Sequence, residues 1–314
     1  NGLNVETASV STAAYSSMPT PTGMVFLMVG ESSVTAQAAG AFTNITAAQS
    51  GLYLVNDTQG TNSAWVQQSS WTSTGLAENT AFSFKAKARN GDADETAETS
   101  LVSTYTLVEA PLGSELTLTA NTSVQITVSV AAPTNSGTGQ TGSDFDNITG
   151  SGSGGTDSGQ LLGSYSFADL GLTPNTVYGY SVRYTNANNV ATLYTAEKTT
   201  RSLAALPGAL DFSDLGTTQL RANWKANNNP GGTAFIVQLT TDAFATLVAT
   251  AQVTAADYLF TGLAVNATYQ AQVKARNADG NDTAWRSLGA TRTFANPPTA
   301  QTHSSNQVST VSWS

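Results

Sequence analysis

One signature of fixed spacing occurs three times in this chain, and it constrains the fold more than any other feature. A leucine is followed three positions later by an asparagine, after three more by an aromatic residue, and eight residues later by a second asparagine. A repeat of this kind indicates a tandem array in which each copy forms one structural unit. The copies are Leu76/Asn79/Phe82/Asn90, Leu172/Asn175/Tyr178/Asn186 and Leu263/Asn266/Tyr269/Asn277.

Apolar or small residues alternate with polar ones between the aromatic residue and the second asparagine. In the first copy, Phe82 and Phe84 alternate with Lys85 and Lys87 over the same stretch. Side chains on a strand point to opposite faces at successive residues, so each copy is predicted to hold a strand with one buried face and one face in water.

Prolines divide the 314 residues into similar lengths. Pro21, Pro111, Pro207 and Pro297 are 90 to 96 residues apart, and proline tends to end a strand because it cannot donate to a β-ladder. We predict three complete units: module 1 (17–107), module 2 (108–204) and module 3 (205–296).

Partial modules are predicted at both ends. Residues 1–16 are interpreted as the last strand of a preceding module, and 297–314 as the first strands of a following one, in which Trp313 corresponds to Trp224. Module 2 also carries a Gly/Ser-rich insert at 131–163. Within it we predict a strand at 144–148, the alternative being a loop that packs on a neighbour.

Composition and charge exclude several functions. The chain has no cysteine, which rules out disulfides, thiolate metal sites and cysteine nucleophiles. Its net charge of −9 and scattered basic residues disfavour nucleic acid and anionic membranes as partners. The longest apolar run, 23–30, is far shorter than the roughly 20 residues that a membrane helix needs.

The signature in module 2, Leu172-Thr-Pro-Asn-Thr-Val-Tyr178, resembles the fibronectin type III domain, as does the Trp224 strand followed by 235–238. The resemblance covers about 17–296 and suggests a divergent bacterial branch. It implies an all-β chain of tandem immunoglobulin-like sandwiches arranged as beads on a string.

The same resemblance implies roles for individual residues. Leu263 closes the end of the sandwich, Tyr269 makes the tyrosine corner by hydrogen bonding back to the loop, and Trp224 fills the core. Leu172 and Tyr178 take the first two roles in module 2, with Val128 in place of the tryptophan. Module 1 has Leu76 but carries Phe82 in place of the tyrosine, so it keeps the ring and loses the hydroxyl bond.

Catalytic and metal sites have weak support in the sequence. The single histidine, His303, has no acidic neighbour in the sequence, and the carboxylates, Asp169 among them, are predicted to lie in solvated turns. We expect no enzyme activity and no cofactor. Calcium remains an alternative, because oxygen-rich turns supply candidate ligands; these are Asp92, Asp94, Asp279 and Asp282.

The sequence also carries candidate sites for glycosylation and for sugar binding. The acceptor pattern Asn-x-Ser/Thr requires an exposed loop, and it occurs at Asn44, Asn56, Asn121, Asn147, Asn266 and Asn281. Trp65 and Trp285 are candidates for an exposed aromatic surface that binds a glycan.

These features favour a structural role outside the cell. We expect an extracellular or cell-surface layer, fibre or stalk protein that associates with copies of itself or with neighbouring modules. The alternatives are a spacer in a secreted polysaccharide-active enzyme and an adhesin that binds a protein or glycan.

Overall fold

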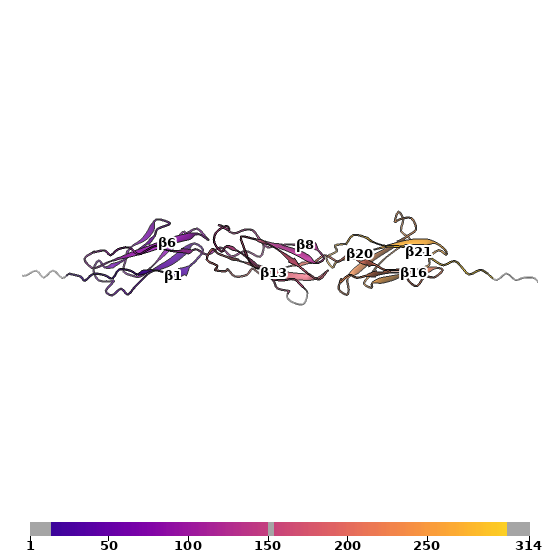
Figure 1. Ribbon diagram of the computed structural model, residues 1–314, viewed down its shortest axis with the longest axis horizontal. Helices are drawn as coiled ribbons and strands as arrows, with labels where there is room; N and C mark the ends of the chain where they lie inside the picture. Colours follow the sequence, from indigo (N-terminus) through magenta and orange to yellow (C-terminus); the bar gives the residue numbers. More distant parts are fainter. Residues whose placement is uncertain (1–13, 150–153, 300–314) are drawn as a thin grey trace, which may run out of the picture. The chain divides into compact units, whose positions relative to one another are not determined.

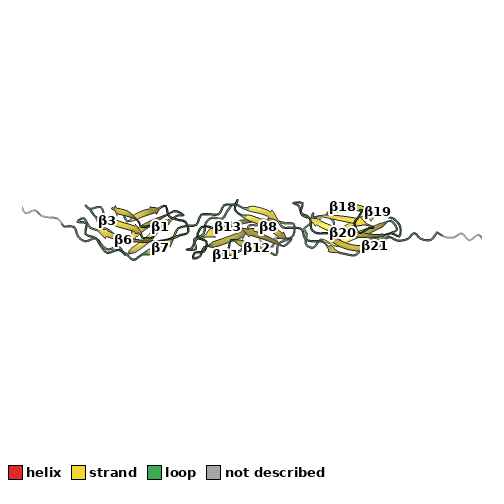
Figure 2. Cartoon of the chain, turned by 90° about the horizontal axis from the view of Figure 1, so that it is seen from above, coloured by secondary structure: helices red, strands yellow, loops and turns green. Residues whose placement is uncertain are grey.

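The chain is all-β in the part that the structure describes. The computed structural model describes residues 14–149 and 154–299, and these contain strands, turns and loops without a helix (Figures 1 and 2). Most of the predicted terminal strands at 1–16 and 297–314, with His303 and Trp313, lies outside the described residues. Residues 14–16 and 297–299 are described and form no strand. The exact boundaries between modules stay predictions.

Module 1 contains seven strands in two sheets. One sheet has the order β1-β2-β5 and the other the order β4-β3-β6-β7. β1 pairs antiparallel with β2, and β3 pairs antiparallel with both β4 and β6. The strands are β1 (Gly23–Val29), β2 (Ser33–Ala39), β3 (Gly51–Asn56), β4 (Thr61–Val66), β5 (Ser70–Thr74), β6 (Ala81–Arg89) and β7 (Val102–Tyr105).

Module 2 repeats this arrangement. Its sheets have the orders β12-β9-β8 and β11-β10-β13-β14. β10 lies in the predicted insert and covers most of the strand expected at 144–148. The strands are β8 (Thr117–Thr122), β9 (Gln125–Ser129), β10 (Gly142–Asn147), β11 (Gly159–Leu162), β12 (Ser166–Leu170), β13 (Val177–Thr185) and β14 (Lys198–Arg201).

Module 3 has the same two-sheet plan. Its sheets are β15-β16-β19 and β18-β17-β20-β21. The strands are β15 (Gly208–Ala209), β16 (Gln219–Lys225), β17 (Ala234–Thr240), β18 (Ala249–Val253), β19 (Asp257–Thr261), β20 (Thr268–Arg276) and β21 (Arg286–Arg292).

The core of each module lies between its two sheets. In module 1, Val34 on β2 and Leu52 on β3 belong to one buried cluster, and in module 3, Leu220 on β16 and Val237 on β17 belong to another. Side chains from both sheets therefore meet in one interior, which is the arrangement of a β-sandwich.

The predicted alternation holds for two of the three signature strands. β6 and β20 alternate between buried and half-buried residues along their lengths. β13 differs, because Gly179 and Ser181 on its outer face are buried as well. Gly179 donates its N–H to Thr149 Oγ1 at 2.6 Å, and a Cβ at this glycine would overlap the Glu197 carboxylate. The chain around these two residues covers the face that was expected to lie in water.

The chain forms two compact units whose limits differ from the repeat. The first comprises 1–119, 126–170 and 178–200, and therefore includes module 1 and most of module 2. The second comprises 120–125, 171–177 and 201–314, so that one end of module 2 packs with module 3.

Candidate functional site at the inter-module joints

The signature leucines and aromatic residues all lie in the module interiors. In module 3, the Tyr269 hydroxyl accepts a hydrogen bond from the N–H of Ala264 at 2.9 Å, which makes the expected tyrosine corner. Trp224 is buried in the same core. The other buried residues of this set are Leu76, Phe82, Leu172, Tyr178 and Leu263.

The first asparagine of each signature has an unusual backbone conformation. Asn79, Asn175 and Asn266 have φ values of 44°, 49° and 52°, in the left-handed region. Asparagine adopts this region more readily than other residues with a Cβ. We call the segments 76–80, 172–176 and 263–267 the signature loops.

A hydroxyl on the residue directly after the last strand of each module fixes the signature loop. Thr106 Oγ1 donates to Ala77 O at 2.7 Å and accepts from the N–H of Thr80 at 3.0 Å. Ser202 and Thr293 make the same pair of bonds in modules 2 and 3, at the same distances. Each hydroxyl lies 27 residues after the signature asparagine. This constant spacing is the sequence signal that could have identified it.

In the first unit, the Asn79 side chain reaches from the signature loop of module 1 into module 2. Its Nδ2 donates to Thr134 O at 3.1 Å, Asn135 O at 3.2 Å and Thr141 Oγ1 at 3.0 Å. Its Oδ1 accepts the N–H of Ala187 at 3.0 Å. Asn79 is fully buried, so these bonds form away from water.

In the second unit, Asn175 makes the corresponding bonds to module 3. Its Nδ2 donates to Thr233 Oγ1 at 2.9 Å, and its Oδ1 accepts the N–H of Ala278 at 2.9 Å. Thr233 precedes β17 as Thr141 precedes β10. Two joints in one chain therefore use the same asparagine, the same hydroxyl position and the same backbone N–H.

The second asparagine of the signature completes each joint. Asn186 and Asn277 each begin a turn and accept two backbone N–H bonds through Oδ1, which shapes an Asx-type turn. Nδ2 of Asn186 donates to Thr106 O at 3.2 Å, and Nδ2 of Asn277 donates to Ser202 O at 3.5 Å. We call 90–95, 186–191 and 277–282 the asparagine turns.

The candidate calcium ligands all have protein partners. Asp92 accepts the N–H of Tyr15, and Asp94 accepts Asn90 Nδ2. Asp279 pairs with Arg201 at 3.2 Å. Asp282 pairs with Arg276 and Lys274, and the Arg276 hydrogen bond holds the pKa of Asp282 well below its usual range. Within 14–149 and 154–299, no group of three His, Asp or Glu side chains converges as metal ligands would.

Two of the six candidate glycosylation sites are buried, and for these the expectation is wrong. Asn56 donates through Nδ2 to Ser73 Oγ at 3.0 Å, and Asn147 donates to Asp169 at 2.7 Å. Both amides are used inside the sandwich because they lie at strand ends that face the opposite sheet. The four exposed sites are Asn44, Asn121, Asn266 and Asn281.

Asp169 was expected in a solvated turn, and this is also wrong. It lies on β12, is fully buried, and accepts bonds from Asn147 Nδ2, the Tyr180 hydroxyl at 2.9 Å and the N–H of Thr156 at 2.8 Å. Three donors replace the water that a buried carboxylate loses. Burial raises the pKa of Tyr180 above its ordinary value, with Asp169 adding to the effect.

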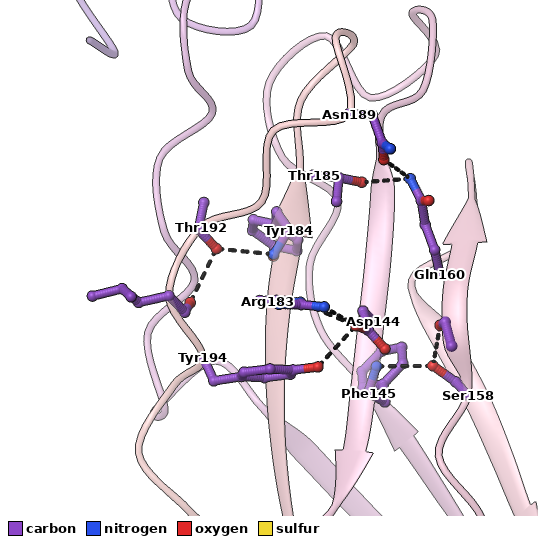
Figure 3. Close-up of polar contacts among 12 residues, drawn as sticks. Asp144, Phe145, Ser158, Gln160, Arg183, Tyr184, Thr185, Asn189, Thr192 and Tyr194 are labelled. Carbon is purple, nitrogen blue, oxygen red and sulfur yellow. Dashed lines mark hydrogen bonds and ion pairs between the residues drawn. The ribbon is translucent and has the colours of Figure 1, made fainter. Parts of the chain in front are cut away.

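The outer face of module 2 holds a second buried carboxylate, Asp144, whose polar contacts are shown in Figure 3. Asp144 on β10 accepts Arg183 Nε at 3.0 Å, Arg183 Nη2 at 2.8 Å and the Tyr194 hydroxyl at 2.8 Å. The Arg183 guanidinium also lies 4.5 Å from the Tyr194 ring centre. Burial raises the pKa of Tyr194 to about 12, so the phenol stays protonated and donates to the carboxylate.

The candidate sugar-binding tryptophans lie beside basic side chains. The Arg89 guanidinium is 4.4 Å from the centre of the Trp65 ring, and Lys274 Nζ is 4.6 Å from the centre of the Trp285 ring. Such cation–π contacts occupy part of each ring. Neither tryptophan is supported further as a glycan platform.

No helix long and apolar enough to cross a membrane occurs among the residues that the structure describes.

Comparison with known proteins gives one curated relative. No protein-family model matches the chain. Exoglucanase B of Cellulomonas fimi is 26% identical over 226 residues, which are 68% of this chain and 20% of exoglucanase B. The chain thus spans about a fifth of that protein's length.

Two solved structures are similar at low identity. The FN1–FN3 domains of chicken CNTN1 have 12% identity and a TM-score of 0.27, covering 89% of this chain and 100% of theirs. A two-domain fibronectin type III segment of chicken tenascin has 15% identity and a TM-score of 0.42, covering 59% of this chain and 100% of its own. The strand orders of the three modules show that this chain is a tandem array of two-sheet antiparallel β-sandwiches, and module 3 has the tyrosine corner that the resemblance to fibronectin type III implies.

Proposed function

We propose that this chain is a non-catalytic structural array of the cell exterior, a component of a layer, fibre or stalk, whose modules hold neighbouring parts at a set spacing and orientation. One observation carries the proposal, namely the joint in which a buried asparagine binds the next module through both its amide nitrogen and its oxygen.

The chemistry of the joints suits a fixed connection. Domains in one chain move relative to each other by default unless their interface restrains them. The bonds of Asn79 and Asn175 are directional and are made by neutral groups. We therefore expect the joints to keep their geometry over a wide range of pH and salt, as a structural protein of the cell exterior requires.

The non-catalytic part of the proposal rests on how the carboxylates are used. The most buried ones, Asp144 and Asp169, each accept hydrogen bonds from donors of their own module. A general acid or base needs a group that can exchange its proton with a substrate.

Electron microscopy and light scattering of the purified chain test the assembly role. A layer or fibre protein is expected to form ordered polymers at micromolar concentration through self-association. A monodisperse monomer at millimolar concentration would contradict assembly and would leave the fixed spacing as the only function of the joints.

The similarity to exoglucanase B favours a second candidate function. In that case the array is a spacer within a secreted polysaccharide-active enzyme, and its joints set the distance between other domains. The spacer is expected to stay monomeric. The native chain and its Asn79→Ala variant can each be placed between the same two fluorescent proteins. The efficiency of energy transfer should differ between the two, and equal efficiencies would contradict the spacer role.

A further inference from the structure

We propose that the end of module 3 around Asn266 is a preformed docking surface for the asparagine turn of another module of the same kind. The inference rests on the proposed function and extends it, because it names the partner that this end of module 3 takes.

The third signature loop has the backbone of the other two. Asn266 has a φ of 52° and donates its N–H to Phe294 O at 3.1 Å, as Asn79 does to Leu107 O at 3.1 Å and Asn175 does to Leu203 O at 3.0 Å. Thr293 holds this loop through the same two bonds that Thr106 makes in module 1. The loop therefore has the shape required for a joint before any partner is bound.

Exposure separates Asn266 from its two counterparts. Asn79 is 0% exposed and Asn175 is 8% exposed, whereas Asn266 is exposed, and no side-chain hydrogen bond of Asn266 is present among the described residues. The neighbouring Phe294 is also 54% exposed, while Leu107 and Leu203 at the same position are half-buried. An amide and an apolar side chain that are covered in two joints are thus uncovered together in the third copy.

The two occupied joints define what the partner must supply. It needs a hydroxyl before the central strand of its larger sheet, as in Thr141 and Thr233, to accept from Asn266 Nδ2. It needs an asparagine followed by a small residue, as in Asn186-Ala187, so that the backbone N–H of that residue reaches Asn266 Oδ1. The asparagine amide then donates to the carbonyl of Thr293, as Asn186 does to Thr106.

Module 1 carries the complementary half of this pattern at its opposite end. Asn90 and Gly91 begin its asparagine turn, and Ser50 precedes β3 at the position of Thr141. These three residues line a cavity of about 60 Å³ together with residues 15–19, Thr43 and Asn44. Asn90 Nδ2 already donates to Tyr15 O at 3.4 Å, as Asn186 does to Thr106 O. Both halves of a joint thus exist among the described residues, one around Asn266 in module 3 and the other around Asn90 in module 1.

The test replaces residues 296–314 with a second copy of module 3, residues 205–296, joined after Ala295. We call this variant the extended chain. At this junction the copied Ala205 follows Ala295, just as Ala205 follows Ala204 in the native chain. The probe is the Asn266 side-chain amide and the N–H of the copied Ala278, both followed by NMR hydrogen exchange. We expect both to exchange on the order of tenfold more slowly than in a chain without a docked turn.

Two variants make the result specific. Asn266→Ala in the extended chain should return the copied Ala278 N–H to fast exchange, whereas Asn44→Ala should not, although Asn44 is also exposed and has a φ of 59°. A second extension, with residues 109–204 of module 2 in place of 205–296, guards against a copy that fails to fold. If neither extension protects Asn266, the proposal is wrong.

The readout separates this proposal from the function on which it rests. If Asn79→Ala and Asn175→Ala loosen the native joints while Asn266 stays unprotected in both extensions, the array function stands and the docking surface does not. If none of the three asparagines affects the exchange of its partner N–H, the joints themselves carry no restraint and both proposals fall. The chains are produced without glycosylation, because a glycan on Asn266 Nδ2 would block the contact.

Discussion

Replacing Asn79 with alanine is the most direct test of the joint. The Asn79 amide has two N–H groups and one oxygen, and its four contacts in module 2 amount to about three full hydrogen bonds. At roughly 1 kcal/mol each, their loss costs about 3 kcal/mol. Alanine at a φ of 44° adds about 1 kcal/mol of backbone strain. We expect a destabilisation of about 4 kcal/mol.

Asn266→Ala is the matched control, because it shares the signature position and a φ of 52° but lacks the buried contacts. It should cost only the backbone strain of about 1 kcal/mol. Asn79→Gly should show the loss of the hydrogen bonds without the backbone strain, since glycine tolerates the left-handed backbone and removes the same bonds. The difference between Asn79→Ala and Asn266→Ala is therefore the contribution of the joint.

Hydrogen exchange measured residue by residue is the suitable assay, because a chain of several modules need not unfold in one step. The N–H of Ala187, which is bonded to Asn79 Oδ1 and is 7% exposed, reports on the joint directly. We expect its exchange to become about a hundredfold faster in Asn79→Ala. Equal losses of stability in Asn79→Ala and Asn266→Ala, with an unchanged Ala187 rate, would refute the reasoning.

Three further predictions concern single modules. Tyr269→Phe should destabilise module 3 by about 0.5–1.5 kcal/mol and Phe82→Tyr should stabilise module 1 by a similar amount, as judged by denaturant unfolding, because the corner hydroxyl bond is lost or gained. The Thr240 hydroxyl, with further bonds from Thr246, lowers the pKa of Asp242 to about 2. A carboxylate whose pKa is depressed on folding stabilises the fold above its unfolded pKa of about 3.9 and loses that effect as pH falls towards 2. Thr240→Val should therefore raise the midpoint of the Asp242 titration followed by ¹³C NMR. An unchanged midpoint would mean that the Thr240 hydroxyl does not cause the low pKa of Asp242. Trp224→Ala should cost about 3–5 kcal/mol in module 3, since the ring is buried in the core, and a loss below 1 kcal/mol would contradict its role there.

The fold could be predicted from the sequence because its main signals are local. The period-2 alternation around Phe82 and Tyr269 depends only on which face of a strand meets the core, and both strands follow it. The resemblance to fibronectin type III also placed Trp224 and the tyrosine corner correctly.

The roles of polar residues could be predicted less well. Asp169 and Asn56 carry side chains typical of turns, yet both are buried, because a partner on another strand satisfies each of them. Such pairs join residues far apart in sequence, so no local pattern reveals them. The repeat identifies the signature asparagine but not its contact with the next module, since Ala187 lies 108 residues beyond Asn79.

The offset between the sequence repeat and the compact units has a practical consequence for dissecting the protein. Segments 120–125 and 171–177 come from module 2 by sequence but pack with module 3. A fragment that starts at 201 would therefore lack Asn175, leaving Thr233 and the N–H of Ala278 to be satisfied by solvent. Properties measured on such a fragment would describe a module without the segments that pack on it. Fragment boundaries should therefore keep both partners of the asparagine contact in the same fragment.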